Sequence, residues 1–215
     1  MKKWSNLVPR RTGGFPGSGI CPADGQSTRI MGVDPGVVAT GFGVIEMGRD
    51  GLILYLGSGV VRPQRNQAFS HRLQQIYRGL SRQIEKFNPQ LMAVESPFYA
   101  KNVKSAMLLG QAKGVALLAA AETGVEVQEY SPLEVKQAVV GYGRAGKEQV
   151  QTMIRALLHP PPDLAADAAD ALAVALCFAH SLPWHISLGA HGTRRFLPGK
   201  SSPAPHPNSE GKDSR

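Results

Sequence analysis

The amino-acid sequence predicts one α/β domain, built on a mixed five-stranded sheet with helices on both faces. Three β-type runs joined by turn signals come first, and periodic helical segments then alternate with short apolar runs. The predicted element order is β-β-β-α-β-α-β-α-α-α, which is typical of a layered α/β architecture. At 215 residues with 42% hydrophobic content, the chain can bury one substantial core.

The first part of the chain predicts two consecutive antiparallel hairpins. Its β-type runs cover residues 29–34, 40–47 and 52–61. A Pro-Gly pair separates the first two runs and an Arg-Asp-Gly sequence separates the second two. Both sequences favour tight turns between neighbouring strands.

The middle of the chain predicts two helices with a strand between them. Apolar residues recur every three or four positions over 69–87, and Asn88-Pro89 ends that pattern. The short apolar run 91–95 is typical of a strand covered on both faces. Residues 103–122 form the second helical segment, which is rich in Gly and Ala.

The second helical segment has a face of small residues, with Gly110 and Gly114 four positions apart. Such a face lets another backbone approach closely. Packing within the same chain is the usual explanation in soluble proteins, and a homodimer contact is the alternative.

The rest of the fold is predicted as one strand and three helices. Residues 125–129 alternate as a strand does, and Ser131-Pro-Leu-Glu has the N-cap Ser, first-turn Pro and capping-box Glu of a helix start. A glycine-rich loop at 141–146 is followed by helices at 147–158 and about 164–180, the second of which is an apolar core helix.

The two ends of the chain differ from the middle in composition. Residues 1–28 and 190–215 are basic and rich in Gly, Pro and Ser, which predicts a disordered N-terminal arm and a disordered C-terminal tail around a folded domain at 29–189. A start codon placed too far upstream would also explain the arm. Cys21 and Cys177 are too few for a disulfide framework or a zinc site.

No segment has the composition of a secretory signal, and no clean apolar run approaches the ~20 residues of a membrane span. We therefore expect a soluble intracellular protein with no membrane partner. The net charge is +8, and residues 62–113 hold nine basic side chains against two acidic ones. This basic segment favours a polyanionic partner, although a solvated helix face would look the same.

Four carboxylates occupy positions that predict a common site. Asp34 and Glu95 each end an apolar strand, and Asp167 and Asp170 lie three apart at the start of the last helix. At one sheet edge the four could bind two Mg²⁺ or Mn²⁺ ions about 3.5–4 Å apart, an arrangement that hydrolyses phosphodiesters. Oxygen ligands favour these cations over zinc. For each carboxylate taken alone, a structural role such as capping or ion pairing is the better explanation, and only the four together favour the metal site.

Five segments resemble a known family in their order and spacing, over about residues 29–182. The segments are 32–36 with 40–45, 94–102, 109–115, 135–141 and 166–173. They are similar to the RuvC family of Holliday-junction resolvases. The resemblance implies a ribonuclease H-like fold and a crossover junction endodeoxyribonuclease of recombination and repair.

Such an enzyme nicks two strands of like polarity in a four-way DNA junction and leaves 5′-phosphate and 3′-hydroxyl ends. The resemblance further implies a homodimer with Mg²⁺ as cofactor, up to two ions per subunit, and Mn²⁺ as a substitute. It also implies the RuvA–RuvB branch-migration complex as a partner and a cytoplasmic, nucleoid-associated location in bacteria.

The same resemblance assigns roles to single residues. Asp34, Glu95, Asp167 and Asp170 match the catalytic, metal-binding carboxylates, and Lys147 matches a lysine near the cleaved DNA. The aromatic residue that stacks on junction bases corresponds to Phe98. The other expected DNA contacts are Tyr99, Lys101, Lys104, Lys113 and Lys136.

Three other functions are compatible with parts of the pattern. An actin-like or sugar-kinase ATPase also has an Asp-bearing first hairpin, but it needs two such domains around its nucleotide. A junction-binding protein without catalysis would have lost a carboxylate, and all four are present. A nuclease for other branched DNA would keep the whole site.

Overall fold

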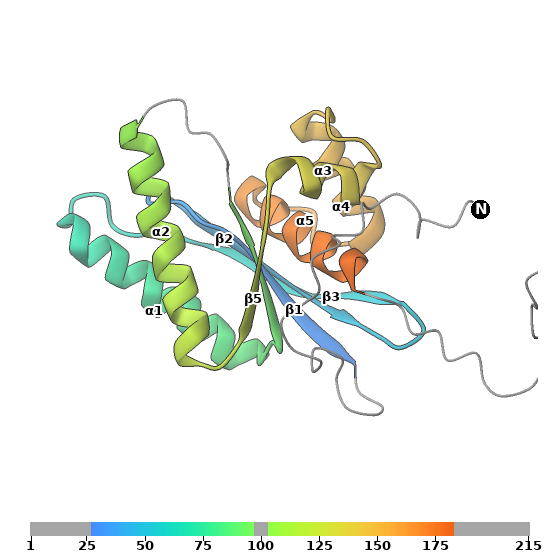
Figure 1. The fold of residues 1–215 in the computed structure, drawn as a ribbon, viewed down its shortest axis with the longest axis horizontal. Helices are drawn as coiled ribbons and strands as arrows, with labels where there is room; N and C mark the ends of the chain where they lie inside the picture. Colours follow the sequence, from blue (N-terminus) through green and yellow to red (C-terminus); the bar gives the residue numbers. More distant parts are fainter. Residues whose placement is uncertain (1–26, 97–102, 183–215) are drawn as a thin grey trace, which may run out of the picture. The chain divides into compact units, whose positions relative to one another are not determined.

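A five-stranded mixed sheet lies between two layers of helices in the computed structural model, which describes residues 27–96 and 103–182 (Figure 1). The strand order is β3-β2-β1-β4-β5. The strands are β1 (Thr28–Asp34), β2 (Thr40–Met47), β3 (Ile53–Val61), β4 (Leu91–Glu95) and β5 (Glu126–Tyr130).

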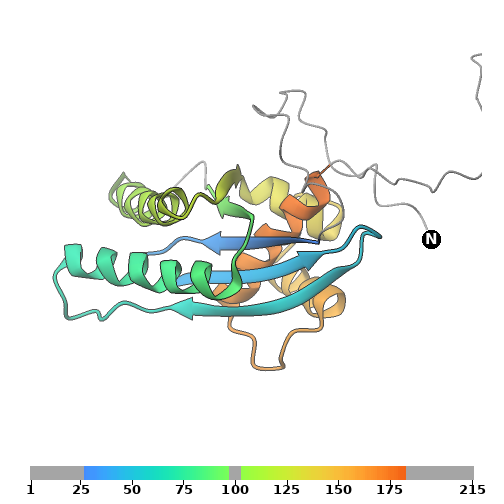
Figure 2. The same cartoon turned by 90° about the horizontal axis from the view of Figure 1, so that it is seen from below.

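Two helices cover one face of the sheet and three cover the other. The helices are α1 (Phe69–Phe87), α2 (Val103–Glu122), α3 (Pro132–Val140), α4 (Lys147–Leu158) and α5 (Ala166–Ser181). One buried cluster joins the sheet to α1 and α2, and a second joins it to α3, α4 and α5. Seen after a 90° turn, α1 runs alongside the strands (Figure 2).

The predicted element order and mixed sheet are confirmed. The helix at 69–87 has the predicted bounds, and Asn88 ends it in the left-handed conformation with φ 47°. The Ser131 capping box is present, with Ser131 N donating to Glu134 Oε2 over 2.8 Å. Four elements differ slightly from their predicted bounds: β1 begins at Thr28, β3 begins at Ile53, β5 covers 126–130 and α5 covers 166–181. The rest of the predicted arm and the predicted tail at 190–215 lie outside the described residues.

Strand directions bring four strand ends to the same side of the sheet. Strand β2 pairs antiparallel with both β1 and β3, whereas β4 pairs parallel with both β1 and β5. Strands β1, β3, β4 and β5 therefore all end at one edge, which we call the carboxyl edge. Residues that follow these strands can meet there although they are far apart in the sequence.

Helix α5 lies unusually close to β1 and β2 because glycines face it. A Cβ atom on Gly32 would come within 2.0 Å of the Ala171 carbonyl oxygen, and one on Gly41 within 2.0 Å of the Asp167 carbonyl oxygen. Real Cβ atoms do not approach backbone so closely, so any larger residue would force the helix away from the sheet. The first turn of α5 is thereby fixed at the carboxyl edge.

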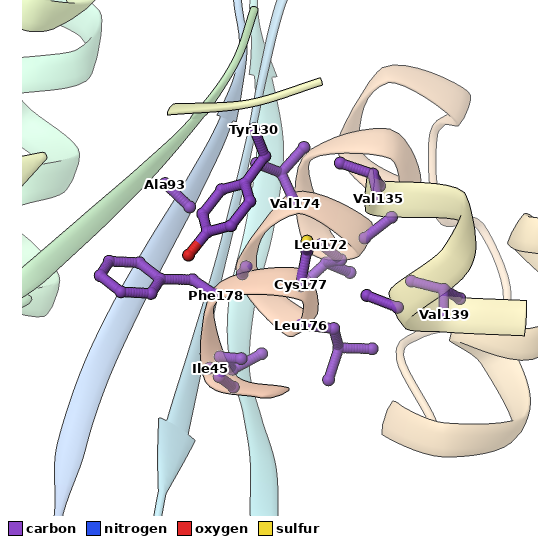
Figure 3. Packing of buried hydrophobic residues seen from close by; sticks show 14 of the residues in the cluster. Ile45, Ala93, Tyr130, Val135, Val139, Leu172, Val174, Leu176, Cys177 and Phe178 are labelled. Atoms are coloured by element: carbon purple, nitrogen blue, oxygen red, sulfur yellow. The ribbon is translucent and has the colours of Figure 1, made fainter. Parts of the chain in front are cut away.

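The core around α5 is closed on all sides. Residues 168–169 and 171–179 of the helix are buried, as expected of a helix that is apolar all round. Figure 3 shows Tyr130 of β5 beside Phe178 of α5, with ring centroids 5.8 Å apart, and α3 contributes Val135 and Val139. The prediction of a core helix is confirmed.

Helix α2 is covered on one side only. Its buried residues are the alanines Ala112, Ala116, Ala119 and Ala120, and the last three belong to the cluster with the sheet and α1. By length and composition alone, α2 is apolar enough to cross a membrane, which the sequence analysis did not expect. It is the one such helix among the described residues, and 22% of its most apolar stretch is buried. Helices of this composition also form protein interfaces, and length alone does not distinguish the two.

We expect Gly32→Ala to destabilise the fold by about 1–3 kcal/mol or more, because its methyl group would overlap the α5 backbone. Chemical denaturation monitored by circular dichroism measures this change. Gly110→Ala is the matched control within one subunit, since a Cβ there points into open space, and in dilute, monomeric protein it should not lower the free energy of unfolding. Equal losses in both variants would show that the close approach of α5 is not the cause.

Candidate active site

Strand register and side-chain alternation place Asp34 beside Glu95. The parallel pairing of β1 with β4 matches Val33 to Val94. The next residues, Asp34 and Glu95, therefore lie side by side at the carboxyl edge. Both carboxylates are on the α5 side of the sheet, because alternate residues of a strand point the same way and Ala93 packs against α5. Asp34 and Glu95 share a side-chain hydrogen bond.

Helix α5 brings the other two carboxylates to the same edge. Asp34 pairs with Gly41 across β1 and β2, and Gly41 touches the Asp167 backbone. Asp170 lies one helical turn later on the same side of α5. The charges of Asp167 and Asp170 both act on Asp34, so the predicted convergence of the four carboxylates is present in the structure.

The turn after Asp34 is held from two sides. The Thr40 hydroxyl donates to the Gly36 carbonyl over 2.8 Å, and the Arg72 guanidinium of α1 donates to the Val37 carbonyl. Gly36 is required because a Cβ atom there would lie 2.3 Å from the Ala39 carbonyl oxygen. These contacts fix the direction in which β1 delivers Asp34. The sequence analysis did not foresee the role of Arg72, whose partner is a backbone carbonyl.

Burial and mutual repulsion raise the pKa values of the two strand carboxylates. The pKa of Asp34 rises to about 8, first because the group is buried and then because Glu95 and Asp170 carry like charges. Burial and the Asp170 charge also raise the pKa of Glu95, while its hydrogen bond with Asp34 and the charges of Lys147 and Lys136 oppose that rise. Because ionised carboxylates are unfavourable in this site, a bound cation that neutralises them would be favoured.

Two basic side chains already contact this acidic cluster. Lys147 Nζ donates to Asp170 Oδ2 over 2.5 Å, and this bond raises the pKa of Lys147. Arg62, which follows β3 at the carboxyl edge, has Nη2 3.7 Å from Asp167 Oδ2. Lys147 is a predicted site residue, whereas the sequence analysis places Arg62 only within the basic segment 62–113.

The donor set fits a hard divalent cation. Four carboxylates offer only oxygen atoms, the ligands that Mg²⁺ and Mn²⁺ prefer. Within residues 27–96 and 103–182, no three Asp, Glu, His or Cys side chains are already arranged as a metal-binding group. Asp170 and Asp167 are instead paired with Lys147 and Arg62. The residues that would hold a cation are therefore Asp34 and Glu95, joined by Asp167 and Asp170.

The predicted DNA contacts have different surroundings. Lys104 is exposed on α2, and Lys136 on α3 is close enough for its charge to act on Glu95. Lys113 is half-buried and forms an ion pair with Glu129. The remaining three, Phe98, Tyr99 and Lys101, lie outside the described residues.

This sheet topology, with carboxylates at the ends of β1 and β4 and on a helix packed across them, defines a ribonuclease H-like nuclease. A family model described as crossover junction endodeoxyribonuclease RuvC matches residues 30–178. The chain therefore belongs to the RuvC family, whose nucleases are metal-dependent and resolve Holliday junctions.

Curated relatives and solved structures agree with this assignment. The chain is 49% identical over 153 residues to a Geobacter sulfurreducens crossover junction endodeoxyribonuclease RuvC, covering 71% of this chain and 93% of the relative. It is 50% identical over 170 residues to the Tolumonas auensis enzyme, covering 78% and 97%.

Among solved structures, Thermus thermophilus RuvC in complex with Holliday junction substrate superposes with a TM-score of 0.66 at 35% identity, covering 71% of this chain and 93% of that one. The yeast mitochondrial Holliday junction resolvase Ydc2 has a TM-score of 0.52 at 14% identity, covering 72% and 80%. At that identity the likeness shows the fold alone.

The raised pKa of Asp34 predicts how the stability of the metal-free protein depends on pH. The unfolded chain loses this proton near the ordinary value of 3.8, whereas the folded chain keeps it until about pH 8. The free energy of unfolding should therefore fall as the pH rises through that interval. Thermal melts in EDTA between pH 5 and pH 8 measure the fall.

Asp34→Asn should flatten this pH dependence and raise the melting temperature most at pH 8. The exposed Asp163→Asn is the matched control and should behave like the wild type. If Asp34→Asn keeps the full slope, the carboxylate cluster is not the origin of the pH dependence.

Proposed function

We propose that the carboxyl edge is where this nuclease hydrolyses one phosphodiester bond in each of two like-polarity strands of a four-way DNA junction. The products would have 5′-phosphate and 3′-hydroxyl ends. The observation that supports this proposal most directly is the convergence of Asp34, Glu95, Asp167 and Asp170 from β1, β4 and α5. We further propose that Mg²⁺ is the cation, with up to two ions per subunit and Mn²⁺ as a substitute.

The side chains of the site have different proposed roles in the reaction. When bound, divalent cations activate water and stabilise the leaving oxygen in phosphodiester hydrolysis. Asp34 and Glu95 hold the ligand oxygens in a fixed direction, since both are half-buried at the ends of paired strands. Lys147 is placed to balance negative charge on the phosphate, because its ammonium group already contacts Asp170 at the rim of the cluster.

DNA contacts are proposed on both sides of this centre. Lys136 and Lys147 lie near the carboxylates, and exposed Lys104 is in the first turn of α2. Phe98 and Tyr99 are proposed to stack on bases near the junction centre, with Lys101 on a neighbouring phosphate. Base–aromatic stacking of this kind contributes ~1–3 kcal/mol per base.

We propose that the chain forms a homodimer through the solvent-exposed face of α2. Val103, Met107 and Leu118 are 77%, 62% and 51% exposed, and Gly110 and Gly114 on the same helical face meet open space. Large apolar residues beside glycines suit close packing against a second helix. A second subunit would also supply the second catalytic centre that paired nicking needs.

Two further properties follow from the family as proposals. A resolvase of this kind would act in the bacterial cytoplasm, at the nucleoid, where its DNA substrate is found. It would work with the RuvA–RuvB complex, which moves the junction to sites that the nuclease can cut.

Asp34→Asn and Asp170→Asn should each lower single-turnover nicking of a synthetic four-way junction by about a thousandfold or more. Cation-assisted chemistry contributes several kcal/mol to the transition state, and each 1.36 kcal/mol is tenfold in rate. Electrophoretic mobility shift in EDTA should show junction binding close to that of the wild type. Mapping the nicks on junction, linear duplex and fork DNA, with and without Mg²⁺, gives the substrate and the cofactor.

Asp163→Asn controls for the removal of a charge in the same part of the chain and should cut at the wild-type rate. Full-rate nicking by either site variant would exclude the proposed centre. A wild type that cuts forks but not four-way junctions would exclude the proposed substrate.

Met107→Glu should convert the proposed dimer to a monomer, because a charge would be buried in an apolar contact. Sedimentation velocity measures the change in mass. Leu52→Glu, at a position that is 57% exposed away from α2, should leave the mass unchanged. A wild type that is monomeric at micromolar concentration contradicts the proposal.

A further inference from the structure

Lys113 of α2 is held by two polar groups beside the active site. Its Nζ donates to Glu129 Oε2 over 2.5 Å and to Ser96 Oγ over 2.9 Å. Ser96 directly follows the proposed cation ligand Glu95, and Glu129 lies on the neighbouring strand β5. One ammonium group therefore joins a helix to the ends of two parallel strands.

The Lys113 contacts lie on the face of the sheet opposite to the carboxylates. The register matches Val94 to Glu129, and Val94 belongs to the buried cluster beneath α1 and α2. Glu95, one residue later, points to the α5 side. Lys113 thus contacts the end of β4 from behind, while Glu95 faces the site.

Ser96 is fixed by its backbone as well as by its side chain. Its N–H donates to the Tyr130 carbonyl over 2.8 Å, which continues the pairing of β4 with β5 past Glu95. The hydroxyl accepts from Lys113, which ties the same residue to α2. Together these bonds leave the peptide after Glu95 little freedom to rotate.

We propose that Lys113 is a positioning residue for Glu95, acting through Ser96 and Glu129, and that it is not a phosphate contact. This proposal rests on the nuclease function proposed above. Two of the three donors of the Lys113 ammonium are already used within the protein, and its side chain is only 23% exposed. By contrast, Lys104 on the same helix is exposed and free to meet DNA.

Displacement of a cation ligand by about 1 Å can lower a catalytic rate by as much as 100-fold without changing substrate binding. Lys113→Met and Glu129→Gln both break the ion pair, from opposite sides, and they change the net charge in opposite directions. A positioning role predicts the same effect from both variants. A phosphate-contact role predicts opposite effects, because Glu129→Gln would release Lys113 toward DNA.

The test compares full-length variants in single-turnover nicking of a four-way junction across a Mg²⁺ titration. Lys113→Met and Glu129→Gln should each slow nicking about 10- to 100-fold and raise the half-saturating Mg²⁺ concentration severalfold. The double variant should be no slower than either single one, since both remove the same interaction. Lys113→Arg should retain most of the rate because it can keep the ion pair.

Junction affinity in EDTA, measured at several salt concentrations, completes the test. Affinity and its salt dependence should stay at wild-type values in Lys113→Met and Glu129→Gln. Weaker binding by Lys113→Met with a salt slope lower by about 0.9, together with tighter binding by Glu129→Gln, would overturn the proposal in favour of a phosphate contact.

Glu46→Gln is the matched control, because Glu46 forms an ion pair with Arg29 over 2.9 Å on β1 and β2, away from the carboxyl edge. It should change neither rate nor Mg²⁺ dependence. Equal rate losses in this control, or unaltered Mg²⁺ dependence in the Lys113 and Glu129 variants, would overturn the proposal. Either result would show that the Lys113 ion pair only stabilises the fold. A wild type that fails to nick any junction would refute the nuclease proposal itself.

Discussion

The closeness of α5 to the sheet is the constraint on which the rest of this structure depends. Gly32 and Gly41 have no side chains on the face that α5 covers, so the helix backbone lies directly on β1 and β2. The helix is also enclosed by α3 and α4 and cannot move outward without opening the core. Asp167 and Asp170 therefore keep a fixed position relative to the strand carboxylates.

The same constraint creates an electrostatic conflict that the protein tolerates. Asp34 and Glu95 lie half-buried next to each other, and the Asp170 charge disfavours ionisation of both. Lys147 and Arg62 relieve part of this repulsion from the rim of the site. Such local instability is common at catalytic centres, where groups are arranged for chemistry and the surrounding core supplies the stability.

The sequence was sufficient for the secondary structure and for placing two carboxylates at strand ends and two in the first turns of the last helix, because both depend on local pattern. Helix periodicity set the bounds of α1, and each strand carboxylate followed an apolar run. Tertiary packing decided the smaller differences. Strand β5 extends to Tyr130, where its backbone still pairs with Glu95 of β4 and its side chain packs on Phe178.

Partners of the basic residues could not be predicted in the same way. The sequence shows the segment 62–113 as one continuous basic region, but in the fold its basic residues have different partners. Arg62 meets Asp167, Arg72 holds the Val37 carbonyl, and Lys113 pairs with Glu129. Each partner lies on another element, so only the strand order and helix placement reveal it.

The origin of the carboxylates also has a consequence for the newly synthesised chain. Helix α5 is the last element of the described fold to be translated, and it provides two of the four acidic groups. A nascent chain that has formed only its hairpins and first helices has an incomplete acidic cluster. The cluster of four carboxylates is therefore complete only once α5 has been made.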